Sequence, residues 1–357
     1  MNASASPAVQ ADDASQLLEL IHGGWTSQTL CAAVELGLVD RLAAGARSLE
    51  RLAPELRCDA QALRRLLRAL ASLGIVSEQD DGGFALTRLG RRLCADAPDS
   101  LQAQATWFGR HSWPLWSQLD DSVRTGLGVR QRAAGAGGYR HLEADPEAAR
   151  VFNLAMVQLT RLVAAAVASA CDFSAARHFI DVGGGYGELL AACLSANPQA
   201  SGTLLDMAHA LPGARRHLAD AGLADRADAQ QGDFFVSLPG CADVYLLKAV
   251  LHNWDDAHCA SILARLRQAM SAQALLVVVE RVLPGRVQTS SAHRAVVRSD
   301  LNMLVSLGGR ERTEGEFASL LVAAGFAEPK FVAAAAGFCA IQTRVRSAGC
   351  DDPDAPP

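Results

Sequence analysis

Charged side chains follow short apolar runs at five places in the chain, as expected where parallel strands end at a ligand site. These side chains are Asp181, Asp206, Asp233, Lys248 and Glu280, and His252 comes shortly after Lys248. Carboxylates accept hydrogen bonds from hydroxyl and ammonium groups, whereas an imidazole exchanges protons near neutral pH. The pattern therefore predicts a bound cofactor and a general base at one edge of a sheet.

The cofactor is indicated by the glycines after Asp181, in the run Gly183-Gly184-Gly185-Tyr186-Gly187. A dinucleotide fingerprint needs glycines at its first, third and sixth positions, but the sixth residue from Gly183 is Glu188. The resulting G-x-G-x-G pattern favours S-adenosylmethionine, whose ammonium and sulfonium groups suit Asp181. A glycine-rich turn that binds no ligand is the alternative interpretation.

Two further strand ends complete the predicted cofactor site. Asp206 can accept hydrogen bonds from both ribose hydroxyls. The triplet Gly232-Asp233-Phe234 places a carboxylate near an adenine amine and an aromatic ring over the adenine face. Asp233 has an equally simple interpretation as a residue that caps a turn.

The reactive groups are expected at His252, Glu280 and Glu311. Glu280 ends the apolar run Leu275–Val279, where a purely structural charge is unusual. Glu311 lies in a loop before a helix and has no capping role there, unlike Glu314 and Glu316. A histidine held by a carboxylate suits a general base. No group of Asp, Glu and His has the spacing of metal ligands along the chain, so we expect no metal.

The elements that must position these residues form three blocks. Residues 14–100 read as short helices followed by a hairpin over 75–86, which is a winged-helix pattern, and residues 101–170 read as a helical connector. Residues 171–345 alternate strands and helices, which predicts an open parallel sheet with helices on both faces. The expected strands are 178–182, 202–206, 227–231, 243–247 and 274–280, with an antiparallel pair at 329–334 and 337–343. Residues 1–13 and 346–357 are expected to be disordered tails.

Composition limits the compartment and the partners. Half of the 357 residues are apolar, and the net charge is −5, which gives no general attraction to nucleic acid or to anionic membranes. The nine cysteines are scattered and form no C-x-x-C pair, which favours a reducing cytoplasm. The N-terminus lacks the features of a signal peptide, and no apolar run approaches the ~20 residues that span a bilayer.

The chain closely resembles the small-molecule O-methyltransferases of the caffeic acid and flavonoid type from plants and their bacterial relatives in secondary metabolism. The resemblance extends over about residues 14–344. Its motifs are Asp181–Gly187, Asp206, Gly232-Asp233, Lys248, Leu251–Asp256, Glu280 and Gly308–Thr313. It implies a Rossmann-like S-adenosylmethionine methyltransferase domain and an N-terminal winged-helix domain that forms a homodimer.

The resemblance also implies roles for individual residues. His252 would be the general base, and Glu280 and Glu311 would hold it. The expected cofactor contacts are Asp181, Gly183, Gly185, Asp206, Gly232, Asp233, Phe234 and Lys248, and S-adenosylhomocysteine would be the product. The expected pocket for a flat aromatic acceptor contains Phe152, Met156, Asn253 and Met303, although plant members often carry Asp at position 253.

Three alternatives remain open from the sequence. A winged helix often binds DNA, and the helix near 59–72 carries Arg64, Arg65 and Arg68, although the acidic net charge argues against it. A relative of this fold can also keep the cofactor and catalyse decarboxylation, hydroxylation or a pericyclic step. Transfer of the methyl group to nitrogen or sulfur, which needs less help from a base, is the third.

Overall fold

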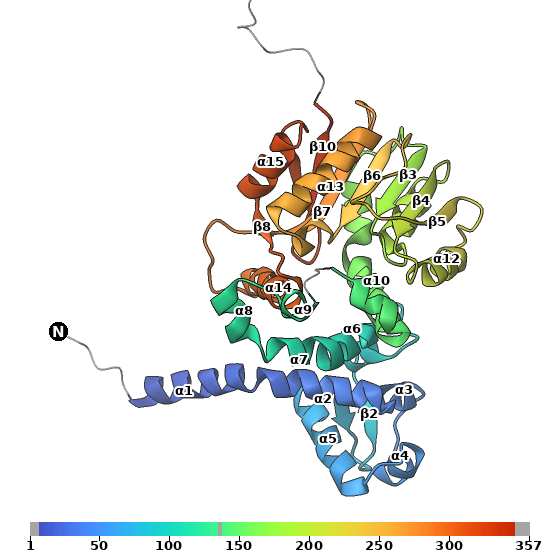
Figure 1. The fold of residues 1–357 in the computed structure, drawn as a ribbon. Helices are drawn as coiled ribbons and strands as arrows, with labels where there is room; N and C mark the ends of the chain where they lie inside the picture. The colour runs from blue at the N-terminus through green and yellow to red at the C-terminus, as the bar shows by residue number, and fades with distance from the viewer. Residues whose placement is uncertain (1–6, 135–137, 347–357) are drawn as a thin grey trace, which may run out of the picture. The chain divides into compact units, whose positions relative to one another are not determined.

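The computed structural model describes residues 7–134 and 138–346. Contacts divide the chain into two compact units, Met1–Trp113 and Pro114–Pro357 (Figure 1). The residues that we expected to form a connector, 101–170, therefore fall in both units. The short helix α7 (Trp113–Trp116) lies at the division.

The first unit is helical with one small hairpin. Strands β1 (Val76–Glu78) and β2 (Phe84–Leu86) pair antiparallel after helix α5 (Ala60–Ser72), in the order that the winged-helix prediction requires. The remaining elements are α1 (Pro7–Ile21), α2 (Gly23–Glu35), α3 (Leu38–Ala43), α4 (Leu49–Glu55), η1 (Gly90–Leu93), α6 (Gln102–Thr106) and the π-helix η2 (Trp107–Ser112).

Helix α5 shows why this unit folds as it does. Leu63, Leu67 and Leu70 recur at helical spacing and are buried in the core of the unit, and Asp59 caps the helix by accepting a hydrogen bond from the Ala62 amide. Arg64, Arg65 and Arg68 lie on the opposite, exposed side.

The prediction of a disordered tail over residues 1–13 is wrong for residues 7–13, which belong to α1. Alanine and glutamine favour a helix even where they bury little, and a proline fits the first helical position. Residues 1–6 lie outside the described residues. At the other end, Arg346 still bonds through its amide to the Gly325 carbonyl, and residues 347–357 lie outside the description.

The second unit is built on one sheet with the strand order β5-β4-β3-β6-β7-β10-β9, and β8 pairs with β7. The first five strands are parallel, and β10 runs antiparallel to both β7 and β9. Their bounds are β3 (His178–Val182), β4 (Ser201–Asp206), β5 (Ala227–Gln231), β6 (Val244–Lys248), β7 (Leu275–Leu283), β8 (Arg312–Thr313), β9 (Lys330–Ala333) and β10 (Phe338–Arg344). The expected parallel sheet and its antiparallel end are confirmed.

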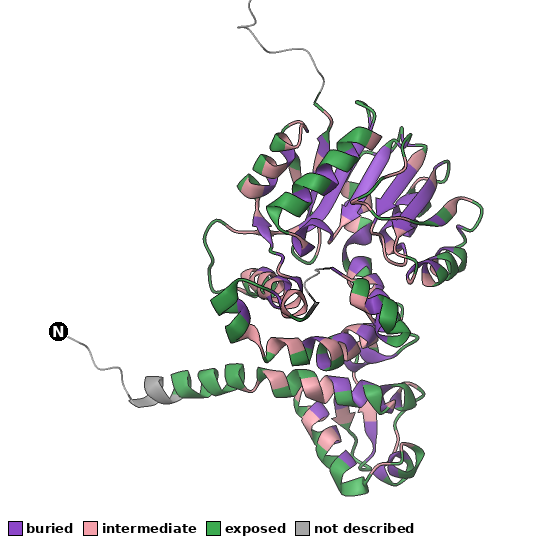
Figure 2. Ribbon diagram, viewed as in Figure 1, coloured by how far each residue is buried: buried purple, intermediate pink, exposed green. Residues whose placement is uncertain are grey.

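The two faces of this sheet carry separate cores because side chains alternate along a strand. On β7, Val277 packs into the core formed with helices α10, α11 and α12, whereas Val278 packs against α13 and α15. Figure 2 shows the central strands buried and the outer side of α13 exposed. Burial on both faces explains why these strands read as continuous apolar runs.

The helices of the second unit connect successive strands or precede the sheet. They are α8 (Leu119–Thr125), α9 (Val129–Ala134), η3 (Arg140–Ala144), α10 (Pro146–Ala170), α11 (Glu188–Ala196), α12 (Leu211–Asp220), η4 (Leu251–Asn253), α13 (Asp256–Ala269), α14 (Ser291–Leu307) and α15 (Glu314–Ala323).

Helix α10 corrects one expectation, because its length and hydropathy are sufficient to cross a membrane. In the structure 44% of its most apolar window is buried, and it packs against α11. Arg161 on this helix forms an ion pair with Glu188 of α11. These features are those of a core helix in a globular domain, and its apolar composition follows from that burial.

Candidate active site

The glycine turn lies directly after β3. Gly183, Gly185 and Gly187 have φ angles of 69°, 61° and 83°, a region that other residues rarely adopt. A Cβ atom on Gly185 would lie 3.2 Å from Oδ1 of Asn153, a contact tighter than side chains usually make. The backbone thus forms an open cradle that only glycines allow.

Asp206 is tied to this turn because β4 runs parallel to β3 and both strands end at the same edge. Its Oδ2 accepts a hydrogen bond of 2.7 Å from the Gly185 amide, and its Oδ1 accepts one of 2.7 Å from the Met207 amide. Burial raises the pKa of Asp206 despite these bonds. The carboxylate therefore lies at the mouth of the glycine cradle, as predicted.

Asp181 lies beneath the same turn and is only 1% exposed. By distance and angle, neither carboxylate oxygen has a hydrogen-bond partner among the described residues, although the nearby Leu190 amide favours the charged form. Burial, with the charge of Asp206, raises the pKa of Asp181 to about 7. An unpaired buried carboxylate beside a glycine cradle fits a cofactor that carries positive charge.

Lys248 ends β6, the neighbour of β3 on the other side. Burial lowers its pKa to about 8, although Glu280 and Asp181 favour its charged form. Its Nζ lies 4.9 Å from the centre of the Phe338 ring. Lys248 therefore interacts electrostatically both with Asp181, a predicted cofactor residue, and with Glu280, a predicted catalytic residue.

The residues after β5, Gly232-Asp233-Phe234, match the predicted cofactor contacts only in part. Asp233 is exposed, and its Oδ1 accepts a hydrogen bond of 2.9 Å from the Phe235 amide, so the turn interpretation is realised. The ring of Phe234 lies beside Gly183, 3.6 Å from where a Cβ would be, which keeps it a suitable cover for an adenine. A Cβ on Gly232 would collide with Leu205, so this glycine is required for packing.

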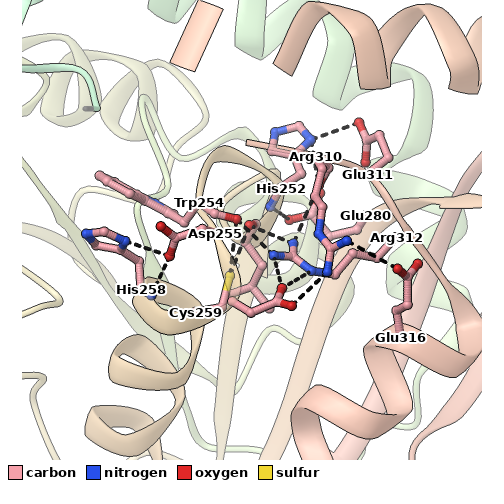
Figure 3. A network of polar contacts seen from close by, with 12 residues as sticks. His252, Trp254, Asp255, His258, Cys259, Glu280, Arg310, Glu311, Arg312 and Glu316 are labelled. Carbon is pink, nitrogen blue, oxygen red and sulfur yellow. Dashed lines mark hydrogen bonds and ion pairs between the residues drawn. The ribbon is translucent and has the colours of Figure 1, made fainter. Parts of the chain in front are cut away.

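His252 sits in the short 3-10 turn η4 after β6 and is 8% exposed. Its Nδ1 is 3.0 Å from Oε1 of Glu311, which also accepts a 2.6 Å hydrogen bond from the Ser299 hydroxyl (Figure 3). An Nδ1–H donor to a carboxylate leaves Nε2 with a free lone pair. The ring is therefore set up to accept a proton at Nε2.

Glu280, on β7, lies in the same site as His252 and Glu311 but hydrogen-bonds to the backbone and not to the ring. Its Oε1 accepts hydrogen bonds from the backbone amides of Val250, at 3.0 Å, and His252, at 3.3 Å. Its Oε2 lies 3.4 Å from Nδ1 of His252 without hydrogen-bond geometry. Glu280 thus holds the backbone that carries the histidine, whereas Glu311 holds the ring.

The charges within this group favour a protonatable histidine. Burial by itself lowers the pKa of His252, but Glu280 and Glu311 outweigh it and raise the pKa above its usual value. Burial raises the pKa of Glu280, and the negative charge of Glu311 adds to this. Burial also raises the pKa of Glu311, but His252 and Ser299 bring it below its usual value. The imidazolium is therefore stabilised by the charges of Glu280 and Glu311, and Glu311 adds a direct hydrogen bond to the ring.

The three residues also offer ligand atoms within 4.8 Å of one another, enough to hold a metal ion. Spacing along the chain could not reveal this group, because the three residues come from three separate segments. Glu311 already receives the Nδ1 hydrogen and Glu280 two backbone amides, an arrangement that suits orientation of the ring.

Two of the predicted acceptor residues, Phe152 and Asn253, contact Tyr139, which was not among the predicted site residues. The hydroxyl of Tyr139 donates a 3.0 Å hydrogen bond to Oδ1 of Asn253, and its ring lies 4.8 Å from that of Phe152. Met156 is half-buried one turn after Phe152 on α10, and Met303 is buried on α14, which packs against η4. The spacing in the sequence gave no sign of Tyr139, because its partners lie on other elements.

Comparison with known proteins agrees with this geometry. Residues 116–327 match the model of the O-methyltransferase domain, and residues 18–96 match that of the O-methyltransferase dimerisation domain. The chain belongs to the O-methyltransferase family and is a methyltransferase that uses S-adenosylmethionine. The helix with the three exposed arginines lies within the dimerisation domain, which favours a homodimer over the DNA-binding alternative.

Curated relatives with high identity are O-methyltransferases of bacterial secondary metabolism. The chain is 39% identical over 330 residues to phenazine O-methyltransferase PhzM of Lysobacter antibioticus, covering 92% of this chain and 96% of that protein. It is 40% identical over 328 residues to O-demethylpuromycin-O-methyltransferase of Streptomyces alboniger, covering 90% and 86%. The crystal structure of LaPhzM superposes with a TM-score of 0.88 at 39% identity, over 93% of this chain and 99% of that one.

Proposed function

We propose that this protein transfers the methyl group of S-adenosylmethionine to a hydroxyl group of a small aromatic acceptor, with His252 as the general base. The observation that carries this proposal is the 3.0 Å contact between Nδ1 of His252 and Glu311, which leaves Nε2 free. Methyl transfer from S-adenosylmethionine needs a nucleophilic acceptor oxygen. A neutral Nε2 can produce one by removing the proton of the acceptor hydroxyl.

The chemistry explains why a base is needed. A phenol has a pKa of about 10, so little of it is ionised at neutral pH. Proton removal by a positioned base typically gives ~10²–10⁴-fold acceleration. As the proton moves to Nε2, Glu311 stabilises the imidazolium through Nδ1, and Glu280 keeps the backbone of His252 in place.

The cofactor would be held at the edge where β3, β4 and β6 end. When bound, S-adenosylmethionine supplies a methyl group already activated by the sulfonium. The glycine cradle would receive it, Asp206 would bond its ribose, Asp181 would face its positive charge, and Phe234 would cover its adenine. Lys248 joins this set from β6, and alignment of donor and acceptor supplies much of the remaining acceleration.

The acceptor would lie between α10, α14 and the η4 turn. Phe152, Met156 and Met303 give this space an apolar lining suited to a flat ring, and Asn253 with Tyr139 adds polar groups beside the base. We place the reaction in the cytoplasm, where the free cysteines among the described residues would stay reduced. A mass-spectrometric screen of aromatic hydroxy compounds with labelled methyl donor would identify the acceptor.

The central test is His252→Ala, with His258→Ala as the matched control. His258 is an exposed histidine bonded to the helix cap Asp255, and it lies outside the catalytic group. We expect His252→Ala to lose at least ~100-fold in turnover, measured as S-adenosylhomocysteine formed, with cofactor affinity by calorimetry nearly unchanged. Equal turnover in the two variants would exclude His252 as the base.

The same assay separates the alternatives. A protein that uses its cofactor for decarboxylation, hydroxylation or a pericyclic step would form no S-adenosylhomocysteine in proportion to product. Fragmentation of the methylated product would show whether oxygen, nitrogen or sulfur received the methyl group. Transfer to nitrogen or sulfur would leave the His252→Ala variant with much of its activity.

A further inference from the structure

Arg312 is a fully buried guanidinium with 0% exposure, directly after the residue that orients the base. Its Nη1 donates to the Leu251 carbonyl at 3.1 Å, and its Nη2 donates to the Trp254 carbonyl at 2.9 Å. Nε and Nη2 also bond Oδ1 of Asp256, at 3.1 and 2.8 Å. Figure 3 shows this fork beneath the His252 turn. One side chain thus holds both flanks of the turn that carries His252.

The residues before Arg312 hold the centre of the same turn. The Arg310 amide donates a 2.9 Å hydrogen bond to the His252 carbonyl. A Cβ on Gly309 would collide with that carbonyl, so only glycine allows this approach. Glu311 bonds the imidazole itself. The segment Gly309–Arg312 therefore contacts both the backbone of the His252 turn and the imidazole ring of His252.

The chemistry of Arg312 suits holding a loop in place. Its planar fork presents several donors in fixed directions, which a lysine ammonium does not reproduce. Burying a charged group is costly, and a buried ion pair is weak evidence for stability by itself. Apart from a 3.5 Å bond to the Arg310 carbonyl, the bonds of this fully buried arginine end on the His252 turn and on Asp256, the first residue of α13. This arrangement indicates that the geometry of the turn must be held.

We propose that the segment Gly309–Arg312 is a clamp for the catalytic turn and that Arg312 is its main positioning residue. By fixing the carbonyls on both sides of His252, Arg312 keeps Nδ1 within reach of Glu311 and Nε2 aimed at the acceptor. Arg312 touches neither the acceptor nor the cofactor in this role. The inference rests on the proposed function of His252.

The clamp makes a prediction that a purely structural role does not. The charged groups that face His252 are Glu280 from β7, Glu311 from the clamp and Lys248 from β6. If the turn loosens while the ring stays buried, Glu311 moves away from the ring and the pKa of His252 falls. The base acts when it is neutral, so kcat rises with pH through the pKa of His252. When this pKa falls, that rise, the acidic limb of the kcat–pH profile, moves to lower pH. The plateau value of kcat at higher pH also drops, because the ring is less well aligned.

The test compares Arg312→Lys with Arg267→Lys, an exposed arginine on α13 as the matched control. We expect Arg312→Lys to lower kcat at least about tenfold, since a few tenths of an ångström at the base is costly. Cofactor affinity by calorimetry stays within about twofold, and the acidic limb moves to lower pH. Arg267→Lys behaves as the unmodified enzyme.

Asp256→Asn keeps the test decisive if Arg312→Lys fails to fold. The side chain of Asp256 is 57% exposed, so its replacement leaves the core intact while weakening the hold on the guanidinium. We expect a smaller drop in kcat with the same shift of the limb. An unchanged limb in the folded variants, with or without a loss of kcat, would overturn the clamp. Full activity of His252→Ala would instead overturn the proposed function.

Discussion

Replacing Glu311 by glutamine tests the electrostatic core of the site. Glutamine keeps the size of the side chain and an oxygen that can accept the Nδ1 hydrogen, but it removes the charge that stabilises the imidazolium. The carboxylate accepts hydrogen bonds from His252 at 3.0 Å and from Ser299 at 2.6 Å, so its geometry is already fixed. The substitution therefore changes charge with little change in shape.

The magnitude follows from the charged hydrogen bond. Such a bond contributes about 1.5–3 kcal/mol, more than a neutral one, and each ~1.4 kcal/mol is a factor of ten in rate. Because glutamine keeps a neutral hydrogen bond of about 1 kcal/mol, the net loss is about 0.5–2 kcal/mol, so we expect kcat to fall by about 2- to 30-fold. The pKa of His252 falls towards its usual value when Glu311 loses its charge.

The pH dependence of kcat tests the direction of the pKa change at His252 separately from the size of the loss in kcat. The base works when neutral, so kcat rises with pH through the pKa of His252. A raised pKa places that rise at higher pH, and Glu311→Gln moves it to lower pH. The assay is kcat from S-adenosylhomocysteine formation over a pH series, with Glu314→Gln, an exposed acid three residues later, as the control. An unshifted rise or an unchanged plateau would refute the role given to Glu311.

Three further predictions concern the cofactor and the acceptor. Asp206→Ala removes the bonds to the Gly185 and Met207 amides, so we expect at least about tenfold weaker cofactor binding by calorimetry; an unchanged dissociation constant would remove Asp206 from the site. Gly185→Ala forces a side chain into a left-handed conformation that costs ~1–2 kcal/mol, and we expect about tenfold weaker binding at intact fold by circular dichroism. Tyr139→Phe removes the hydrogen bond to Asn253, and we expect a change in KM for the acceptor with unchanged cofactor affinity, which steady-state kinetics and calorimetry would separate.

Much of the fold was readable because each element carries a local signal. The strand predictions at 178–182 and 227–231 match β3 and β5. The signal for β3 is a short apolar run, since this central strand is buried on both faces, whereas β5 is an edge strand with polar, mostly exposed residues and gives a weaker signal. The helical start at Pro7 was missed because a low apolar content was taken as disorder, although helix propensity alone favours that segment. Helix α10 was missed as a candidate membrane span for a different reason, because charged and polar residues interrupt its apolar residues and leave no continuous apolar run.

The sequence predicted the candidate catalytic residues, but it did not predict which contacts each of the two glutamates makes. Glu280 and Glu311 both follow from their positions, since one ends a buried strand and the other lies in a loop without a capping role. That Glu280 binds backbone amides while Glu311 binds the ring depends on the register of β7 against β6 and on the path of the Gly309–Arg312 segment. The grouping of these three residues within metal-ligand distance was hidden for the same reason.

The sequence by itself determined the alternation of strands and helices, the glycine cradle and the types of residue at each strand end, because these depend on neighbours within a few positions. The tertiary structure alone decided which of those residues meet. Arg312 and Tyr139 carry no local signal, and their roles arise from partners more than fifty and more than a hundred residues away in the chain. Contacts of that kind are set by how elements pack, which no short stretch of sequence specifies.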